Sequence, residues 1–286
     1  MYKIVEKTET APNTSLVKVS APQVAAKAQP GQFIVVMVDE RSERIPYTLS
    51  DWSKEDGTVT FVVNEVGRST GKLVSCSEGD ALYSVVGPLG IPPRIDKVGT
   101  IVCAGGCFGI AAILPLARAF KKAGNRVISV IEARAHYLLY LENELRKASD
   151  ELVIATGDGS RGIRGFAPDA IKSLLEGREG RRGDSRIALY DQVIAIGCTF
   201  MLKLVCEATR PFGVKTLVDL CPIIVDATGM CGCCRVQVGG ETKFACVDGP
   251  FFDGHAVDWD VLGFRAAAYV RQEMDSVQSS KVGVRR

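Results

Sequence analysis

The segment Thr100-Ile-Val-Cys-Ala-Gly-Gly-Cys-Phe-Gly109 joins an uninterrupted apolar run to a glycine-rich turn, and the apolar stretch 110–123 follows it. Such a run followed by a helical period is typical of a buried parallel strand that turns into a helix. Pro115 falls inside the helical stretch, where it either marks a delayed start or kinks the helix. The segment therefore predicts the first strand and helix of an α/β unit.

The same alternation continues beyond this unit. The further candidate elements are strands at 126–132, 151–156 and 188–196 and helices at 137–147, 168–175 and 200–209. Alternating strands and helices predict a doubly wound parallel sheet, in which ligands bind at the carboxyl ends of the strands. The residues found after those ends include Gly105, Gly106, Gly109, Arg134, Asp158, Gly197 and Cys198. A glycine-rich turn lets a pyrophosphate approach backbone amides, although close packing of a helix on a sheet requires the same residues.

The first third of the chain has a different period. Short β-rich runs at 2–8, 15–19, 32–38, 58–65 and 81–86 are separated by Pro, Gly, Asn and Asp. This pattern predicts a small antiparallel β barrel.

Two motifs within the predicted barrel carry groups that suit a phosphate ligand. Arg44-Ile-Pro-Tyr47-Thr48-Leu-Ser50 offers a cation, an aromatic ring and two hydroxyls, which we expect around one turn. Val66-Gly67-Arg-Ser69-Thr70-Gly-Lys-Leu73 follows a strand and opens a short helix, whose amino terminus favours a diphosphate. A surface turn with a helix cap explains either motif taken alone.

These motifs, followed in order by Gly87-Pro-Leu-Gly90, resemble the flavin domain of the ferredoxin–NADP reductase family. The resemblance implies that FAD binds here. It assigns the ribose, diphosphate and ring to Arg44, Tyr47, Thr48 and Ser50, and the diphosphate also to Gly67, Ser69 and Thr70. Arg44 precedes Thr48 by one position more than the arginine does in most of the family.

The turns at 105–109 and 197–201 resemble the two nicotinamide-dinucleotide loops of the same family, with Cys198 in the place of a usual proline. The resemblance implies that Gly105, Gly106, Gly109, Gly197 and Cys198 bind NAD(H) or NADP(H), with Arg134 and Asp158 near the adenosine ribose. Glu132 and Arg134 act in opposite directions on a 2′-phosphate. We favour NADH because one arginine without a companion lysine makes a thin phosphate pocket.

Four candidate metal ligands follow later in the chain: Asp226, Cys231, Cys234 and Cys246. Their spacings of x4, x2 and x11 are typical of a plant-type [2Fe-2S] loop, with Asp226 in the place of the first cysteine. A zinc knuckle or a reduced structural cysteine cluster is the alternative. Cys233 is the rival for the fourth position, and we expect only one of the adjacent Cys233 and Cys234 to ligate iron.

The composition limits the other possibilities. A chain of 286 residues suggests about two domains, or three if one is small. The formal net charge of +2 is too small to favour nucleic acid or an anionic membrane surface, and no apolar run reaches the length of a membrane span. Ten cysteines without an export signal indicate a reducing compartment, so we expect a cytoplasmic protein.

Across nearly its whole length the chain resembles a family of electron-transfer subunits. The family includes the electron-transfer subunit of dihydroorotate dehydrogenase and the small subunit of NADH-dependent ferredoxin:NADP oxidoreductase, also called sulfide dehydrogenase. Aspartate at 226 and the ending Cys246-Val-Asp-Gly-Pro250 resemble the second, whose aspartate ligand favours Asp226 over Cys233. The implied parts are an FAD-binding β barrel at 1–97, an NAD(P)-binding α/β sheet at 98–220 and a small [2Fe-2S] segment at 221–286.

The resemblance also implies a function. A hydride passes between nicotinamide and FAD, and single electrons then reach the [2Fe-2S] cluster, with no obligatory catalytic side chain. The implied partner is a large glutamate-synthase-like iron–sulfur flavoprotein subunit, through which ferredoxin reacts in electron bifurcation among NADH, NADPH and ferredoxin. One alternative is that the chain is the electron-transfer subunit of an NAD-dependent dihydroorotate dehydrogenase. The others are a self-contained NAD(P)H:acceptor reductase and a non-enzymatic zinc-binding module.

Overall fold

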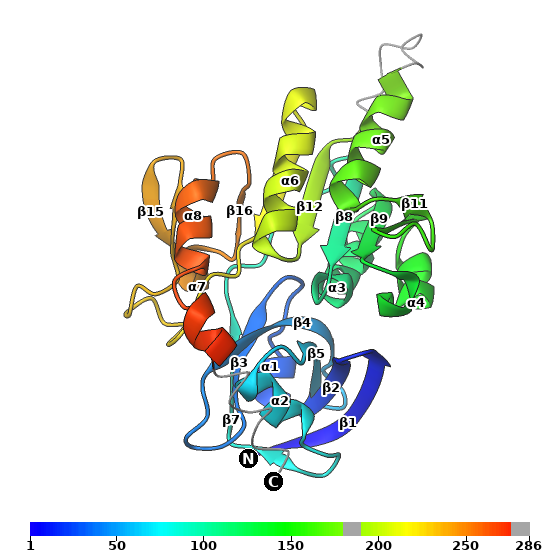
Figure 1. Ribbon diagram of the computed structural model, residues 1–286. Helices are drawn as coiled ribbons and strands as arrows, with labels where there is room; N and C mark the ends of the chain where they lie inside the picture. The colour runs from blue at the N-terminus through cyan, green and yellow to red at the C-terminus, as the bar shows by residue number, and fades with distance from the viewer. Residues whose placement is uncertain (180–189, 276–286) are drawn as a thin grey trace.

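In the part of the chain that the structure describes, two seven-stranded sheets and one two-stranded hairpin form the framework of the fold (Figure 1). The computed structural model describes residues 1–179 and 190–275. None of the helices in these ranges has the length and the apolar character needed to cross a membrane.

The first sheet is the antiparallel barrel that the sequence predicts, nearly closed and drawn at the bottom of Figure 1. Its strand order is β6-β1-β2-β5-β4-β3-β7. Inward side chains such as Val17, Leu49 and Phe61 are fully buried, because successive side chains of a strand point to opposite faces. The elements are β1 (Tyr2–Ala11), β2 (Thr14–Ser20), α1 (Pro22–Ala25), β3 (Phe33–Met37), β4 (Ile45–Ser53), β5 (Thr58–Asn64), α2 (Arg68–Val74), β6 (Ala81–Leu82) and β7 (Ser84–Leu89).

Two details of the barrel correct the sequence-based expectations. The motif at 44–50 does not form a turn. Residues 45–50 belong to strand β4, whose backbone pairs with β3 on one side and β5 on the other, and Arg44 immediately precedes it. The run 81–86 is divided at Tyr83 into β6 and β7, which pair with β1 and β3.

The second sheet confirms the predicted doubly wound sheet, with the order β11-β10-β9-β8-β12-β13-β16. Its neighbouring strands are parallel except for β13 and β16. Helices α3 and α4 pack into one core and α5 and α6 into another, on opposite faces (Figure 1). The elements are β8 (Thr100–Gly106), α3 (Gly109–Lys122), β9 (Arg126–Ala133), η1 (His136–Leu138), α4 (Glu142–Ala148), β10 (Glu151–Thr156), β11 (Ile163–Arg164), α5 (Ala167–Glu179), β12 (Gln192–Ile196), α6 (Thr199–Thr209), η2 (Arg210–Phe212) and β13 (Lys215–Asp219).

The order of the strands reverses at β8, and this reversal determines where a ligand can bind. The chain proceeds from β8 through β9 and β10 on one side, and β12 then pairs with the other side of β8. The turns after β8 and β12, residues 105–109 and 197–198, therefore lie next to each other at the carboxyl edge. Ligands of open α/β sheets bind at such a reversal.

The helix predicted at 137–147 is wrong in its extent. A single 3₁₀ turn covers His136–Leu138, and α4 begins only at Glu142. Leu141 separates them with a φ of 55°, a left-handed conformation through which no right-handed helix continues. Pro115 lies inside α3. Of the strand predicted at 188–196, residues 188 and 189 lie outside the described ranges, and β12 begins at Gln192.

The last part of the described chain is a small unit at the upper left of Figure 1. Strands β14 and β15 form an antiparallel hairpin, whereas β16 adds an antiparallel edge strand to β13 of the second sheet. This edge strand ties the small unit to the sheet. Its elements are β14 (Arg235–Val238), β15 (Glu241–Phe244), α7 (Ala245–Asp248), β16 (Phe251–Asp253) and α8 (Trp259–Ala266).

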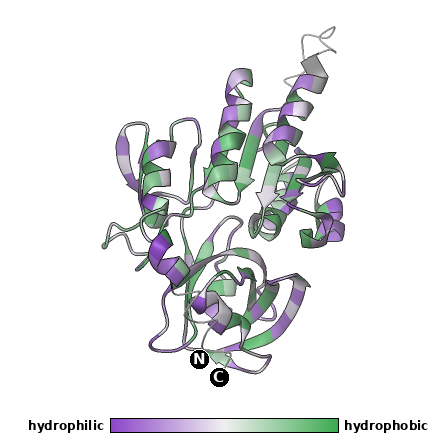
Figure 2. Cartoon of the chain, in the orientation of Figure 1, coloured by the Kyte–Doolittle hydropathy of each residue, from purple (hydrophilic) through white to green (hydrophobic). Residues whose placement is uncertain are grey.

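Helix α3 is buried on two sides. Its apolar residues share one core with Ile101 and Val127 of the sheet and with Val62 of the barrel. Figure 2 shows the same division, with mostly hydrophobic strands and a largely hydrophilic α4 at the edge of the molecule. Helix α3 therefore joins the barrel to the sheet.

Replacement of Gly109 by alanine should destabilise this arrangement, because the new Cβ would lie 1.9 Å from the carbonyl oxygen of Ile196 in β12. We expect the free energy of unfolding to fall by about 3 kcal/mol or more, as at overpacked core sites. Urea unfolding of the purified chain measures the change.

Gly263→Ala in α8 is the matched control, since Gly263 is exposed and a Cβ there would have no atom within 4 Å. Alanine should stabilise this helix by up to about 1 kcal/mol. Equal stability of the two variants would contradict the close approach of α3 to β12.

Candidate functional site

A pocket opens between the barrel and the second sheet. Its walls come from β4, β5, the start of α3 and the segment after β13. The lining residues are Pro46, Tyr47, Thr48, Val62, Asn64, Val66, Phe108, Ala111 and Cys221. An inner hollow shares Pro46, Thr48 and Cys221 with this pocket and is also lined by Phe33, Asp219, Leu220, Ile224 and Pro250. At both hollows, the predicted flavin strand β4 therefore lies close to the carboxyl end of β13.

Two buried oxygens at these hollows have no hydrogen-bond partner among the described residues: Tyr47 Oη and Asp219 Oδ2. Burial raises the pKa of Asp219 to about 7, and the neighbouring Thr48 hydroxyl offsets part of this rise. Burial also raises the pKa of the Tyr47 hydroxyl far above its usual value. A polar ring such as a flavin would supply the missing partners, so the lining fits a flavin.

The predicted FAD residues of β4 point in different directions. Thr48 faces the pocket, while the ring of Tyr47 stacks on Phe61 with centroids 4.8 Å apart. Ser50 is buried and donates to the backbone oxygen of Thr60 at 3.0 Å. Arg44 Nη2 donates to the backbone oxygen of Asp226 at 3.2 Å, so its guanidinium joins the barrel to the candidate cluster loop.

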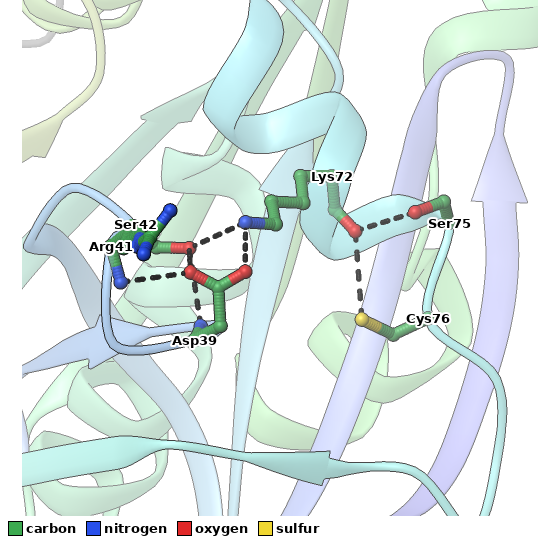
Figure 3. A network of polar contacts seen from close by, with 6 residues as sticks. All are labelled: Asp39, Arg41, Ser42, Lys72, Ser75 and Cys76. Atoms are coloured by element: carbon green, nitrogen blue, oxygen red, sulfur yellow. Dashed lines mark hydrogen bonds and ion pairs between the residues drawn. The ribbon is translucent and has the colours of Figure 1, made fainter.

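Polar contacts hold helix α2 against the loop that precedes Arg44 (Figure 3). Lys72 Nζ of α2 pairs with the Asp39 carboxylate and contacts Ser42 Oγ at 3.0 Å. Its hydrogen bond holds the pKa of Asp39 at about 2. Ser69 Oγ contacts the Glu43 carboxylate in the same loop. An exposed ion pair stabilises little, but these contacts fix the loop that leads into Arg44.

The start of α2 leaves open space in which a ligand could approach its backbone. Thr70 Oγ1 accepts hydrogen bonds from the amides of Val66 and Gly67, each at 3.0 Å. A Cβ at Gly67 would have no atom within 4 Å. The assignment of Gly67, Ser69 and Thr70 to a diphosphate stays a prediction, and the space beside Gly67 suits it.

The glycines of the two adjacent turns are required by packing. A Cβ added at Gly105 would lie 2.6 Å from Gly109 O, and one added at Gly106 would lie 2.8 Å from Glu132 Oε1. A Cβ added at Gly197 would lie 2.5 Å from Met201 Sδ. Cys107, between them, has a φ of 52°. Close packing thus explains the glycines without a ligand, and their role toward a dinucleotide stays a prediction.

Asp158 and Arg134 lie together at the carboxyl edge, as the strand order predicts. The Asp158 amide donates to the Arg134 carbonyl at 3.0 Å. Asp158 Oδ1 accepts from Ser160 Oγ at 2.6 Å and from the Ser160 amide at 2.9 Å, and these bonds lower the pKa of Asp158. Glu132, by contrast, is buried and accepts from the Ala167 amide at the start of α5 at 2.6 Å. Asp158 therefore offers a fixed, ionised and exposed carboxylate at this edge.

The loop at 226–234 folds tightly around its own polar groups. Positive φ angles at Ala227, Gly229 and Gly232 turn its backbone. Asp226 accepts from the amides of Thr228 at 3.0 Å and Cys231 at 2.9 Å, which lowers the pKa of its carboxyl.

The sulfurs of Cys234 and Cys246 are both buried and lie 3.2 Å apart. Burial raises the pKa of Cys246 to about 12, and contact with Cys231 raises the pKa of Cys233. Within residues 1–179 and 190–275, no three or more His, Cys, Asp and Glu side chains are gathered as a metal site requires. The Cys234–Cys246 pair has the chemistry of a thiolate site, and the four-ligand set Asp226, Cys231, Cys234 and Cys246 stays a prediction.

The structure adds residues that the sequence patterns did not indicate. Arg265 Nη2 in α8 donates to Cys233 O at 2.9 Å, and Arg235 Nη1 donates to Gly232 O at 3.0 Å. Asp219 and Cys221 line the inner hollow. Asp219 ends β13 and Cys221 follows it closely, so the rule that ligands lie at carboxyl ends of strands could have identified them. Nothing in the sequence indicates the two arginines.

Comparisons with known proteins agree with this geometry. Residues 222–258 match the iron–sulfur cluster binding domain of dihydroorotate dehydrogenase B. The chain is 42% identical over 278 residues to a dihydroorotate dehydrogenase B (NAD(+)) electron transfer subunit homolog of Thermotoga maritima, covering 97% of this chain and 95% of the relative. It is 29% identical over 250 residues to a probable subunit of the same kind from Methanopyrus kandleri, covering 87% and 88%.

Solved structures show the same relationship. A chain of the NADH-dependent reduced ferredoxin–NADP oxidoreductase, described for flavin-based electron bifurcation, superposes with a TM-score of 0.88 at 40% identity over 98% of this chain and 97% of that one. A ferredoxin NADP⁺ reductase from Neisseria gonorrhoeae with bound FAD and NADP gives a TM-score of 0.57 at 17% identity over 74% and 90%, which shows the fold alone. The chain therefore belongs to the family of dihydroorotate dehydrogenase B electron-transfer subunits and their homologues, and it is an electron-transferring oxidoreductase subunit on the ferredoxin–NADP reductase fold.

Proposed function

We propose that the chain passes electrons between NAD(H), FAD and a [2Fe-2S] cluster, to or from a larger iron–sulfur flavoprotein partner. The barrel at 1–97 would hold FAD, the sheet at 98–220 the dinucleotide, and residues 221–286 the cluster. When bound, FAD exchanges two electrons with nicotinamide and single electrons with a cluster. The contact that best supports this proposal is the hydrogen bond that Arg44, in the predicted flavin motif, donates to the backbone oxygen of Asp226 in the cluster loop.

The residues of this chain have positioning roles in that scheme. Thr48 and Phe108 line the pocket from the barrel side and the sheet side, where a flat ring would lie between the two domains. The reversal of strand order at β8 lies next to the same helix, α3, so the edge of the sheet where we propose that the dinucleotide binds adjoins the flavin pocket. Arg44 and Arg265 hold loop carbonyls, which keeps the cluster loop against the barrel and against α8.

Exposed apolar side chains surround the cluster loop and support the proposal of a protein partner. Met230 is 87% exposed, and Val225 and Val247 are 46% and 40% exposed. Apolar side chains gathered beside a redox centre are typical of an interaction surface. The partner that we propose is a glutamate-synthase-like subunit, through which NADH, NADPH and ferredoxin are coupled by electron bifurcation.

Anaerobic purification of the natively expressed chain with its bound partner tests the proposal. Mass spectrometry, iron content and flavin content should identify a large subunit with its own flavin and additional iron. A large subunit without flavin or iron would contradict the bifurcating assignment.

The name of the 42% identical relative supports a second candidate function, in which the chain is the electron-transfer subunit of an NAD-dependent dihydroorotate dehydrogenase. The two functions share the sites described above and differ in the partner. Orotate-dependent oxidation of NADH by the purified complex would establish the second candidate, and its absence would exclude that reaction for this complex.

Substitution of Asp226 tests the ligand set. Asp226→Ala should leave FAD bound but make the cluster labile, because one iron loses its anionic ligand. Asp226→Cys should keep the cluster with a changed midpoint potential, since a thiolate replaces a carboxylate. Iron and sulfide content and the visible spectrum measure both results.

Cys233→Ser is the control for that experiment, because Cys233 is the neighbouring thiol that is not assigned as a ligand. It should retain iron at the wild-type level. An unaltered cluster in Asp226→Ala, together with iron loss in Cys233→Ser, would show that Cys233 is the fourth ligand.

Asp158 is expected to favour NADH, because an ionised carboxylate at the ribose edge accepts a hydrogen bond from a 2′-hydroxyl and repels a 2′-phosphate. Asp158→Ser should lower the preference for NADH over NADPH by about tenfold, the effect of one hydrogen bond to a charged group. Rapid-mixing absorbance of the bound flavin, with each nucleotide, measures the two rates.

Asp150→Asn is the matched control, since Asp150 precedes β10 at the opposite edge of the same sheet. It should leave the nucleotide preference unchanged. An identical preference in wild type, Asp158→Ser and Asp150→Asn would place the ribose elsewhere.

A further inference from the structure

Asp219 is an acid buried in an apolar setting at the end of β13. It is 3% exposed, and its Oδ2 has no hydrogen-bond partner among the described residues. A buried carboxyl oxygen without a partner is costly, so a structure that retains one usually supplies a ligand or water to it. Asp219 lines the inner hollow that continues the proposed flavin pocket through Pro46, Thr48 and Cys221.

The groups that face Asp219 favour its neutral form over the carboxylate. Thr48 on β4 is the polar neighbour that acts on its pKa, and Cys221 is the titratable one. The other faces of the hollow are apolar, and β16 places Phe251 opposite Asp219 in the sheet register. The remaining apolar lining residues are Phe33, Pro46, Leu220, Ile224 and Pro250. Burial of the carboxyl therefore controls the protonation of Asp219.

We propose that Asp219, as a neutral carboxylic acid, donates a hydrogen bond from Oδ2 to an acceptor atom of the flavin ring bound in the adjoining pocket. A neutral acid held in an apolar site can donate where a carboxylate can only accept. Thr48 faces the other part of the carboxyl and holds its orientation. Asp219 is thus a binding residue for the flavin, and this inference rests on the proposed function.

The proposal makes flavin binding depend on pH. The pKa of Asp219 in the free chain is about 7, so the donor form predominates at pH 6 and is mostly lost at pH 8. Binding that requires the donor form should weaken about tenfold between these two values, since the carboxylate must first take up a proton. At pH 8 the chain should therefore take up about one proton for each FAD bound, and at pH 6 about a tenth of one.

Titration calorimetry of the full chain, freed of FAD and titrated with FAD in buffers of different ionisation enthalpy, measures this proton uptake. Wild type should show uptake at pH 8 and little at pH 6. Asp219→Asn keeps a donor at the same position without an ionisation, so it should bind FAD without proton uptake and with the same affinity at both values. Asp253→Asn on the neighbouring strand β16, where Asp253 is exposed, should behave as wild type.

The calorimetric results distinguish the role of Asp219 from the proposed function on which that role rests. FAD binding by wild type with no proton uptake at pH 8 would overturn the role of Asp219 and leave the proposed function intact. A wild-type chain that binds no FAD at either pH would overturn both.

Thermal unfolding of the free chain gives a second measurement that needs no FAD. The folded-state pKa of Asp219 is raised above its ordinary value, so its contribution to stability is complete at low pH and is lost as pH rises through about 7. The melting temperature of Asp219→Asn relative to wild type should therefore rise between pH 5 and pH 8. A constant difference would overturn the assignment of a neutral acid.

Discussion

The burial of α3 on two sides is the constraint on which the arrangement of the molecule depends. The helix shares one apolar core with the parallel sheet and with the barrel residue Val62, so neither domain can shift without exposing it. Gly109 at its start lies against the backbone of β12, which sets the depth of the helix on the sheet. The pocket between the domains is a consequence of this packing, because the start of α3 forms one of its walls.

Three sites converge on that junction. The reversal of strand order at β8 brings two glycine turns to the start of α3, the end of β13 brings Asp219 and Cys221 to the pocket, and Arg44 connects β4 to the cluster loop. A chain of redox groups needs this convergence, because electrons pass between cofactors only when the protein holds them close together. In the proposed function the cofactors carry the chemistry, and the protein supplies their binding and orientation.

Much of this could be predicted from the sequence, and the remainder has physical reasons. Periodicity identified the barrel strands and the parallel sheet, because burial on one face or two leaves a regular pattern. It failed at β4, where pairing with two strands overrides the turn that Pro46 suggests, and at 137–147, where Leu141 adopts a left-handed backbone. Motifs located the sites but not their contacts. Spacing cannot reveal that Arg44 reaches a loop far along the chain or that one buried oxygen of Asp219 has no partner among the described residues.

We propose that this chain alone carries electrons from a nicotinamide through a flavin to a [2Fe-2S] cluster. Anaerobic addition of NADH to the chain loaded with FAD and iron, followed by visible absorbance and by electron paramagnetic resonance of frozen samples, tests this transfer most directly. The account predicts loss of the flavin absorbance together with the signal of a reduced [2Fe-2S] cluster. Loss of the flavin absorbance with no cluster signal would contradict it, because the flavin and the cluster would then not communicate within this chain.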